Sequence, residues 1–317
     1  MIFEKEIAGA KSIAIGGHIR PDGDCVGSTM AAYNYIKTYF PEVKCDIYLE
    51  DIPNIFRFLK NTEDIQVPSA SKGKEYDLFL VMDCGDGSRL GDSIECFDLA
   101  KKKICIDHHV SNQAFADVNM VMPDASSTCE LFYTTISPDK ITKDIAECIY
   151  VGMVHDTGVF QYSCTHKSTM EAAGVLMEKG IDYSRIIDET FYAKTYEQNL
   201  IQAEAILKSR KFMDGKVLAS FISKEEMEKY NVLPKHLDGI VNQLRITRGV
   251  EIAIFMYQLE DNEYKASTRG KTGIIDLSQI AVHFGGGGHK MAAGFSMKGN
   301  DPWKMVEEII AEIQKQL

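Results

Sequence analysis

Short apolar runs alternate with longer amphipathic segments along the first 160 residues. The runs predict strands at 12–16, 44–49, 77–82, 103–106 and 117–121, and the segments predict helices at 26–40, 126–136 and 141–154. Strands that are apolar along nearly their whole length are buried on both faces, as in parallel sheets. The pattern therefore predicts an α/β domain whose mainly parallel sheet carries helices on both faces.

A different pattern begins near Lys211. Strands are expected at 217–222, 251–258 and 264–268, and helices at 277–284 and 302–316. This mixture is typical of a smaller α+β domain. We expect a first domain over residues 1–180, a helical connector over 181–209 and a second domain over 210–317, with a cleft between the two domains.

The apolar runs of the first domain end in acidic or histidine residues. Ligands of open α/β sheets bind at the carboxyl ends of the strands, so these side chains are expected to form one site. Six of them make a set of oxygen and nitrogen donors without a thiolate: His18, Asp22, Asp24, Asp83, His108 and Asp156. His155 is expected to support that set from outside it.

Such donors suit manganese or another octahedral divalent ion better than structural zinc. Four acids and two histidines exceed the needs of one ion, so we expect two divalent metal ions, with manganese as the expected metal. Taken singly, Asp22-Gly23-Asp24 is also a common turn sequence, and Asp83 also suits a helix cap. The set as a whole indicates two-metal hydrolysis of a phosphate ester.

The second domain contains a glycine run, Gly285 to Gly288, directly before His289. Successive glycine N–H groups at Gly286, Gly287 and Gly288 are able to form a nest for an anion. His289 adds a donor, and Arg269 is suited to bidentate phosphate binding. On this run alone, a flexible glycine loop with a surface histidine is the alternative interpretation.

Composition adds constraints on location and partners. The eight cysteines are scattered without a C-x-x-C pair, which favours reduced, buried thiols over a disulfide framework. The N-terminus does not resemble a signal peptide, and no apolar stretch approaches the length of a membrane span. We therefore expect a cytoplasmic protein without a membrane partner.

The net charge of −11 is unevenly distributed. Residues 1–209 hold 20 Lys and Arg against 32 Asp and Glu, whereas residues 210–317 hold 15 against 14. A long basic track for duplex nucleic acid is absent from the sequence, so short substrates are expected.

Six motifs carry a resemblance to a known family. They are GHIRPDGDCVGS (17–28), VMDCGD (81–86), IDHH (106–109), VHDTGVFQY (154–162), STRG (267–270) and GIIDLSQIAVHFGGGGHKMAAG (273–294). At these residues the chain resembles the DHH phosphoesterases with their associated C-terminal domain, and within them the bacterial nano-RNase group. The resemblance covers nearly the whole chain.

The resemblance implies a manganese-dependent phosphodiesterase that hydrolyses very short oligoribonucleotides, from dinucleotides to about pentamers, to 5′-mononucleotides. Dephosphorylation of 3′-phosphoadenosine 5′-phosphate is a further implied activity, and a homodimer is a family-based expectation. The implied catalytic residues are Asp83, Asp107, His108 and His109. The implied metal ligands are the six donors named above, and the implied substrate-binding residues are Arg269, Gly286, Gly287, Gly288 and His289.

Two alternatives remain open at this point. The same residues would serve a phosphodiesterase of cyclic or linear dinucleotides, such as cyclic di-AMP, pApA or pGpG. A nucleotide-binding sensor without activity is the alternative outside the enzymes. A sensor is expected to have lost one or more metal ligands, and this sequence holds the full set.

Overall fold

The computed structural model describes residues 2–317, and the chain separates into two compact units, one ending at Ala193 and the other starting at Lys194. The segment 181–209, expected as a connector of its own, is shared between them. Helix α7 (Tyr183–Ile187) and the π-helical turn Asp188–Tyr192 belong to the first unit, and α8 (Tyr196–Leu207) belongs to the second. Within the described residues, we find no helix that combines the length and the apolar character of a membrane span.

The first unit is built on a six-stranded sheet in which every pair of neighbours is parallel, in the order β3-β2-β1-β4-β5-β6. Its strands are β1 (Ser12–Gly16), β2 (Lys44–Tyr48), β3 (Ile65–Gln66), β4 (Leu78–Met82), β5 (Lys102–Asp107) and β6 (Val118–Val121). The order reverses direction between β1 and β4, which is where doubly wound sheets bind their ligands. The predicted α/β class is confirmed, and among the strands only the two-residue β3 was not expected.

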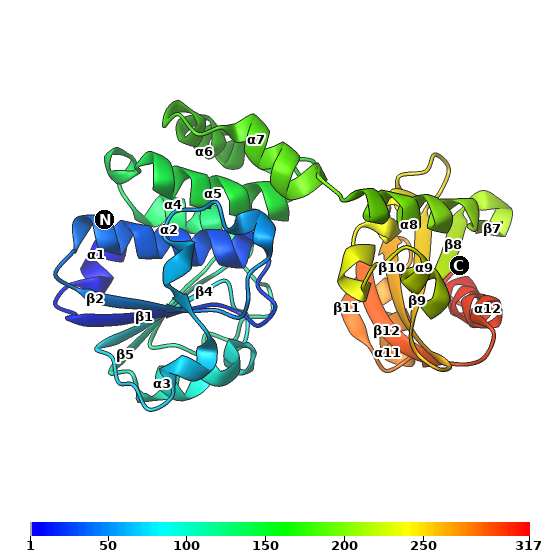
Figure 1. The fold of residues 1–317 in the computed structure, drawn as a ribbon, viewed down its shortest axis with the longest axis horizontal. Coiled ribbons are helices and arrows are strands. Elements are labelled where there is room, and N and C mark those ends of the chain that lie inside the picture. The colour runs from blue at the N-terminus through cyan, green and yellow to red at the C-terminus, as the bar shows by residue number, and fades with distance from the viewer. Residues whose placement is uncertain (1) are drawn as a thin grey trace. The chain divides into compact units, whose positions relative to one another are not determined.

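Helices cover both faces of this sheet. Helices α1, α2, α4 and α5 lie over one face, and α3 lies over the other (Figure 1). The helices of the unit before α7 are α1 (Ile2–Ile7), α2 (Gly23–Tyr39), α3 (Ile94–Leu99), α4 (Thr128–Thr135), α5 (Lys143–Asp156) and α6 (Lys167–Glu178). Short 3-10 turns occupy Asn54–Phe56, Thr62–Asp64, Pro68–Ser71, Gly87–Ser93 and Pro138–Lys140. All eight cysteines are unpaired, and six of them are buried.

Helices α2 and α5 approach each other closely because both carry glycine at the crossing. A Cβ atom on Gly27 would lie 2.5 Å from the carbonyl oxygen of Cys148. A Cβ atom on Gly152 would lie 2.5 Å from Oδ1 of Asp24. Such distances are far below van der Waals contact, so these glycines bring the first turn of α2 against α5.

The second unit is built on a mixed sheet in the order β11-β12-β10-β9-β8-β7, in which only β8 and β9 are parallel. Its strands are β7 (Arg210–Phe212), β8 (Val217–Ile222), β9 (Ile252–Glu260), β10 (Glu263–Gly270), β11 (Gly287–His289) and β12 (Ala292–Lys298). One face packs on α11 (Leu277–His283) and α12 (Pro302–Gln314), and the other on α8, α9 (Lys224–Lys229) and α10 (Ile240–Arg245). Short 3-10 turns lie at Met213–Gly215 and Pro234–Leu237. The predicted α+β class is confirmed, although β7, β11, β12, α9 and α10 were not expected.

Candidate metal centre

The carboxyl ends of β1, β4 and β5, which are neighbours in the sheet, deliver most of the predicted site residues to one place. His18 follows β1, Asp83 follows β4, and His108 follows β5. The start of α2 adds Asp22 and Asp24, and Asp156 is the last residue of α5. The structure thus brings all six predicted metal ligands together, as their separations show.

His18 is one of two imidazoles in this cluster. Its Nε2 atom lies 3.6 Å from Oδ2 of Asp22 and 3.6 Å from Oδ2 of Asp83. Its Nδ1 atom lies 2.8 Å from the carbonyl oxygen of Ile19. Because a carbonyl only accepts hydrogen bonds, Nδ1 carries the proton. In the neutral ring, the lone pair of Nε2 is therefore the one directed at the two acids.

His108 repeats this arrangement with other acids. Its Nε2 atom lies 3.0 Å from Oδ2 of Asp156, 3.8 Å from Oδ1 of Asp83 and 3.9 Å from Oδ2 of Asp24. Its Nδ1 atom donates to the carbonyl oxygen of Ala125, at 3.3 Å. One carboxylate oxygen of Asp83 therefore faces His18, and the other faces His108.

The backbone of Asp83 has a left-handed conformation, with φ of 53°. This region is unfavourable for residues other than glycine, and strained residues cluster at functional sites. The side chain is 2% exposed and accepts a hydrogen bond from Oγ1 of Thr128, at 2.9 Å. The fold thus fixes the one carboxylate that both imidazoles share.

Asp24 is fully buried against the first turn of α4. Its carboxylate accepts the backbone N–H groups of Thr128, at 2.6 Å, and Cys129, at 2.9 Å. These N–H groups belong to a helix N-terminus, which stabilises negative charge. Burial nevertheless raises the pKa of Asp24 well above its usual value, and the charges of Asp83 and Asp156 raise it further.

The pKa values of the other titratable groups reflect the same excess of negative charge. Burial raises the pKa of Asp156 to about 6. Burial lowers the pKa of His18 and of His108. Hydrogen bonds that His18 donates to Asp22 and Asp83, and that His108 donates to Asp156, outweigh burial and raise each pKa to about 10. Protons balance part of the negative charge of the cluster, and divalent cations are able to replace them. The oxygen and nitrogen donors fit such ions.

Asp107 and His109 form a pair next to this cluster. Asp107 is fully buried; its Oδ1 accepts from Nδ1 of His109, at 2.7 Å, and its Oδ2 from Nδ2 of Asn112, at 2.7 Å. The hydrogen bond that His109 donates to Asp107 raises the pKa of His109. Nδ1 of His109 also lies 3.6 Å from Oδ1 of Asp83. Asp107 therefore orients His109. Sequence reasoning missed Asn112, a loop residue, and Thr128, the first residue of α4, because neither carries a local signal.

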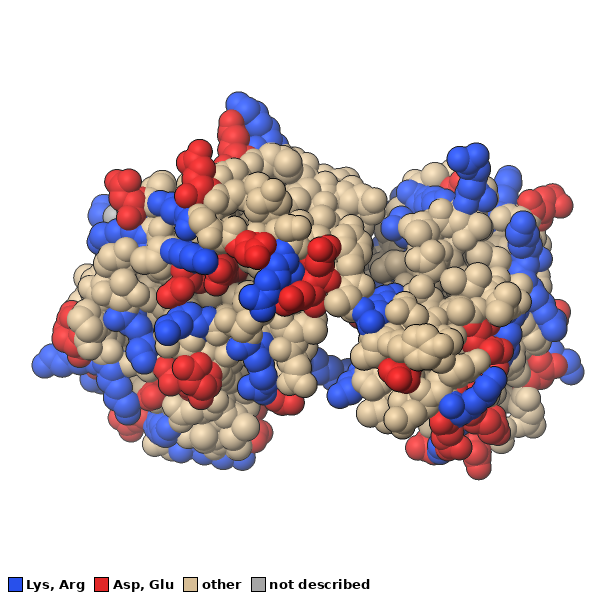
Figure 2. Space-filling model, turned by 45° about the horizontal axis from the view of Figure 1, so that its top comes forward, with Lys and Arg blue, Asp and Glu red and all other residues tan. Residues whose placement is uncertain are grey.

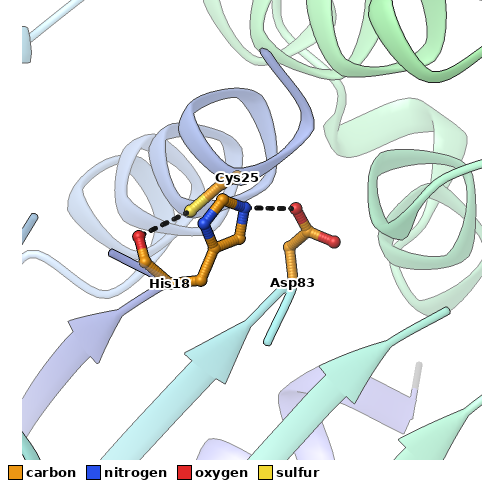
Figure 3. A group of neighbouring side chains, drawn as sticks. All are labelled: His18, Cys25 and Asp83. Carbon is orange, nitrogen blue, oxygen red and sulfur yellow. Dashed lines mark hydrogen bonds and ion pairs between the residues drawn. The ribbon is translucent and has the colours of Figure 1, made fainter. Parts of the chain in front are cut away.

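Cys25 lies beside His18 and Asp83 (Figure 3). Its thiol donates to the carbonyl oxygen of His18, with Sγ at 3.9 Å. Burial raises the pKa of the thiol well above its usual value, and the charges of Asp83 and Asp22 add to this effect. A thiol is a poor metal ligand compared with a thiolate, so Cys25 fits as a support for the His18 backbone.

His155 packs behind the cluster. Its ring lies between Phe56 and Phe191, with centroids 5.0 and 5.6 Å away. The Thr190 hydroxyl donates to the carbonyl of Ile186, so it accepts from Nε2 of His155, at 3.0 Å. Burial lowers the pKa of His155 to about 4, which leaves the ring neutral. The structure places this neutral ring against Gly23, where a Cβ atom would lie 2.3 Å from Cγ of His155.

The second unit holds the five residues predicted to bind substrate. Arg269 on β10 is paired with Ala292 of β12, and His289 on β11 is paired with the same Ala292. Residues in register on neighbouring strands point to the same face, so Arg269 and His289 flank Ala292 on one face of the sheet. Nη1 of Arg269 donates to the carbonyl oxygen of Thr268, at 3.0 Å.

The glycine run is partly strand and not an open loop. A Cβ atom on Gly286 would lie 2.3 Å from the carbonyl oxygen of Gly294, and one on Gly288, where φ is 146°, would lie 2.5 Å from that of Ala292. Gly287 has open space around it. Gly286 and Gly288 are therefore required to be small because β12 packs against them.

Comparisons with known proteins agree with this architecture. Residues 12–153 match the N-terminal domain of the DHH family, and residues 214–317 match the DHHA1 domain. The bifunctional oligoribonuclease and PAP phosphatase NrnA of Thermus thermophilus is 27% identical over 96% of this chain and 90% of its own length. The protein of that name in Bacillus subtilis is 25% identical over 96% and 94%.

A solved structure extends the comparison to the whole fold. The exopolyphosphatase-related protein of Bacteroides fragilis superimposes with a TM-score of 0.87 at 22% identity and covers 99% of this chain and 94% of its own. This likeness shows that the two proteins share a fold. The two domain matches and the NrnA relatives place the chain in the DHH phosphoesterase family, as a hydrolase of phosphoester bonds with a C-terminal DHHA1 domain.

Proposed function

We propose that this protein is a manganese-dependent phosphodiesterase that hydrolyses very short oligoribonucleotides, from dinucleotides to about pentamers, to 5′-mononucleotides. The observation that carries the proposal is the position of Asp83 between two groups of donors. One of its carboxylate oxygens lies 3.6 Å from Nε2 of His18 and the other 3.8 Å from Nε2 of His108. A carboxylate shared in this way is typical of two-metal centres.

The six proposed metal ligands form two groups, one for each ion, and Asp83 belongs to both. His18, Asp22 and Asp83 would hold one ion, and Asp24, Asp83, His108 and Asp156 would hold the other. When bound, two such ions offset the charge of a phosphoryl group and lower the pKa of a water molecule. Manganese suits a set of carboxylates and imidazoles without thiolate.

His109 is the proposed donor to the substrate phosphate. Its Nδ1–H is held by the buried carboxylate of Asp107, which fixes the orientation of the ring. The raised pKa favours the imidazolium, which is a charge-assisted hydrogen-bond donor to phosphate. In this role His109, oriented by Asp107, acts on the substrate, and the six predicted ligands act on the metals.

Arg269 and His289 are proposed to hold a second part of the substrate. They flank one residue on one face of the sheet, where an arginine fork and an imidazole suit a phosphate group. On the face drawn in Figure 2, cationic and acidic side chains are interspersed on each unit, and no continuous basic track is visible. This distribution supports a short substrate over a long duplex.

The names of the relatives support two related activities. Both NrnA proteins are described as oligoribonucleases and as PAP phosphatases. We therefore propose nucleotide bisphosphate dephosphorylation at the same metal centre as a second activity. It requires the same two ions and a shorter substrate.

The test is a panel of substrates with the purified protein and added manganese. The panel contains RNA from two to ten nucleotides, 3′-phosphoadenosine 5′-phosphate, pApA, pGpG and cyclic di-AMP. Faster release of 5′-mononucleotides from dinucleotides to pentamers than from longer chains is the expected result. Preference for pGpG or cyclic di-AMP would replace the proposed substrate, and binding without any turnover would favour a sensor. The Asp83→Asn variant controls for contaminating nucleases.

A further inference from the structure

Glu130, in the first turn of α4, is a buried carboxylate that belongs to neither group of metal donors. It is 5% exposed. Its Oε2 accepts from the backbone N–H of Ser126, at 3.1 Å, from Oγ of Ser126, at 2.5 Å, and from Oγ1 of Thr169, at 2.8 Å. Its Oε1 accepts from Oγ of Ser168, at 2.9 Å. Three hydroxyls and one N–H thus surround it.

This arrangement exceeds what a helix cap requires. Ser127 already caps α4, because its hydroxyl oxygen accepts the backbone N–H of Glu130, at 3.0 Å. In a capping box, an acid at this position reaches back to the N–H of the cap residue. Glu130 instead binds the residue before the cap and the first turn of α6, so it links two segments that are far apart in the sequence.

The first of these segments, residues 125–128, holds three metal ligands in place. The carbonyl of Ala125 accepts from His108, at 3.3 Å. The backbone N–H of Thr128 donates to Asp24, at 2.6 Å, and its hydroxyl donates to Asp83, at 2.9 Å. Ser126, which Glu130 grips through two hydrogen bonds, lies between these contact points.

The second segment follows the fourth ligand. Residues 157–166 join Asp156 to the start of α6, where Ser168 and Thr169 donate to Glu130. The Thr169 hydroxyl also accepts the backbone N–H of His166, at 3.1 Å. The carboxylate therefore fixes the far end of the segment that begins at Asp156.

We infer that Glu130 is a positioning residue for the metal centre. It holds the turn at residues 125–128 and the start of α6 in the arrangement that presents Asp24, Asp83 and His108 to a pair of cations. The inference rests on the proposed function, because it requires that the cluster binds metal. Direct partners of metal ligands change metal affinity by about 10–100-fold when they are replaced, and Glu130 acts through the neighbours of such partners, so a smaller effect is expected.

The test measures manganese binding to the Glu130→Gln variant. The concentration of free manganese is read from its electron paramagnetic resonance signal. Glutamine has nearly the same size as glutamate, but its amide nitrogen cannot accept a hydrogen bond. At least one of the four groups that donate to Glu130 therefore loses its acceptor. We expect manganese binding that is weaker by up to about 10-fold, and activity that recovers at high manganese concentration. The matched control is Glu171→Gln, the same change at an exposed position of α6 that pairs with Lys167.

A second variant covers the case in which Glu130→Gln does not fold. Ser168→Ala removes a single donor on the α6 side and leaves the contacts of Ser126 in place. It is expected to weaken manganese binding by a smaller factor and to reduce the rise in Tm that manganese produces.

The outcomes separate this inference from the proposed function. Wild-type protein that binds no manganese would overturn both. A second outcome would overturn the role of Glu130 alone. In it, the wild type binds manganese, and the folded variants show the same affinity and the same manganese-induced rise in Tm. A lower Tm of the metal-free variant with unchanged affinity indicates a purely structural role and counts against positioning.

Discussion

The two units bring distant residues together by different geometric rules. In the first unit all strands are parallel, so His18, Asp83 and His108 meet because each follows the carboxyl end of a neighbouring strand. In the second unit, Arg269 and His289 lie on either side of Ala292 because antiparallel register sets both beside it. Chain direction therefore builds one site, and cross-strand register builds the other.

The two units also differ in charge and burial. Residues 1–193 hold 18 Lys and Arg against 30 Asp and Glu, and residues 194–317 hold 17 against 16. Among the described residues, every group with metal-ligand spacing lies in the first unit. Its central acids are buried, whereas the three residues of β11 are exposed. We therefore expect changes in the first unit to affect metal binding and turnover, and changes in the second to affect substrate affinity.

The largest effect is expected from Asp83→Asn. An amide keeps the volume but removes the negative charge that both imidazoles face. Turnover should fall by more than the roughly 10–100-fold that is typical of an outer partner of a metal ligand. The measurement is kcat on a dinucleotide with saturating manganese, together with manganese binding. Activity like that of the wild type would contradict the two-metal assignment.

A large pH effect is expected on manganese affinity. The pKa values of His18 and His108 are raised to about 10, so both rings carry protons near neutral pH and must release them to bind a cation. Affinity should therefore rise with pH, by up to about 100-fold per unit if both protons leave together. Calorimetry in buffers with different ionisation enthalpies measures the protons released. Binding without proton release would show that the metal-free cluster is not protonated.

A smaller, selective effect is expected from Arg269→Ala. Loss of a charged hydrogen-bond donor to phosphate costs about 1.5–3 kcal/mol, or roughly 10–100-fold in KM. Because Arg269 lies outside the metal centre, kcat and manganese affinity should change little. Steady-state kinetics on a dinucleotide separates the two parameters, and Arg269→Lys shows how much depends on the fork geometry. A fall in kcat with constant KM would contradict the assignment of turnover to the first unit and substrate affinity to the second.

The smallest effect on activity is expected from a pair of glycine substitutions. In Gly286→Ala the new methyl group meets the backbone of Gly294 and Phe295, whereas in Gly287→Ala it meets open space. The first should lower the free energy of unfolding by about 1–3 kcal/mol, and the second should leave it nearly unchanged. Chemical denaturation of the two variants measures the difference. Equal stability would show that Gly286 is not packed against β12 in solution.

Much of the architecture follows from the sequence because the signals are local. Continuous apolar runs specify buried parallel strands, and Asp107-His108-His109 at the end of one of them already identifies a site. The weak elements were missed for a physical reason. β3 has two residues, and β11 consists of glycines and a histidine, so neither carries a hydrophobic period.

Sequence by itself determined the class of the fold, the chemical type of the donors and the expectation of one shared metal centre. Only the tertiary structure decided which oxygen of Asp83 faces which imidazole, and that Thr128 contacts Asp83, Asn112 contacts Asp107 and Glu130 contacts Ser126. Those partners are common polar residues that lie in turns or near a helix start. Their role depends on contacts across the chain, which no local pattern of residues encodes.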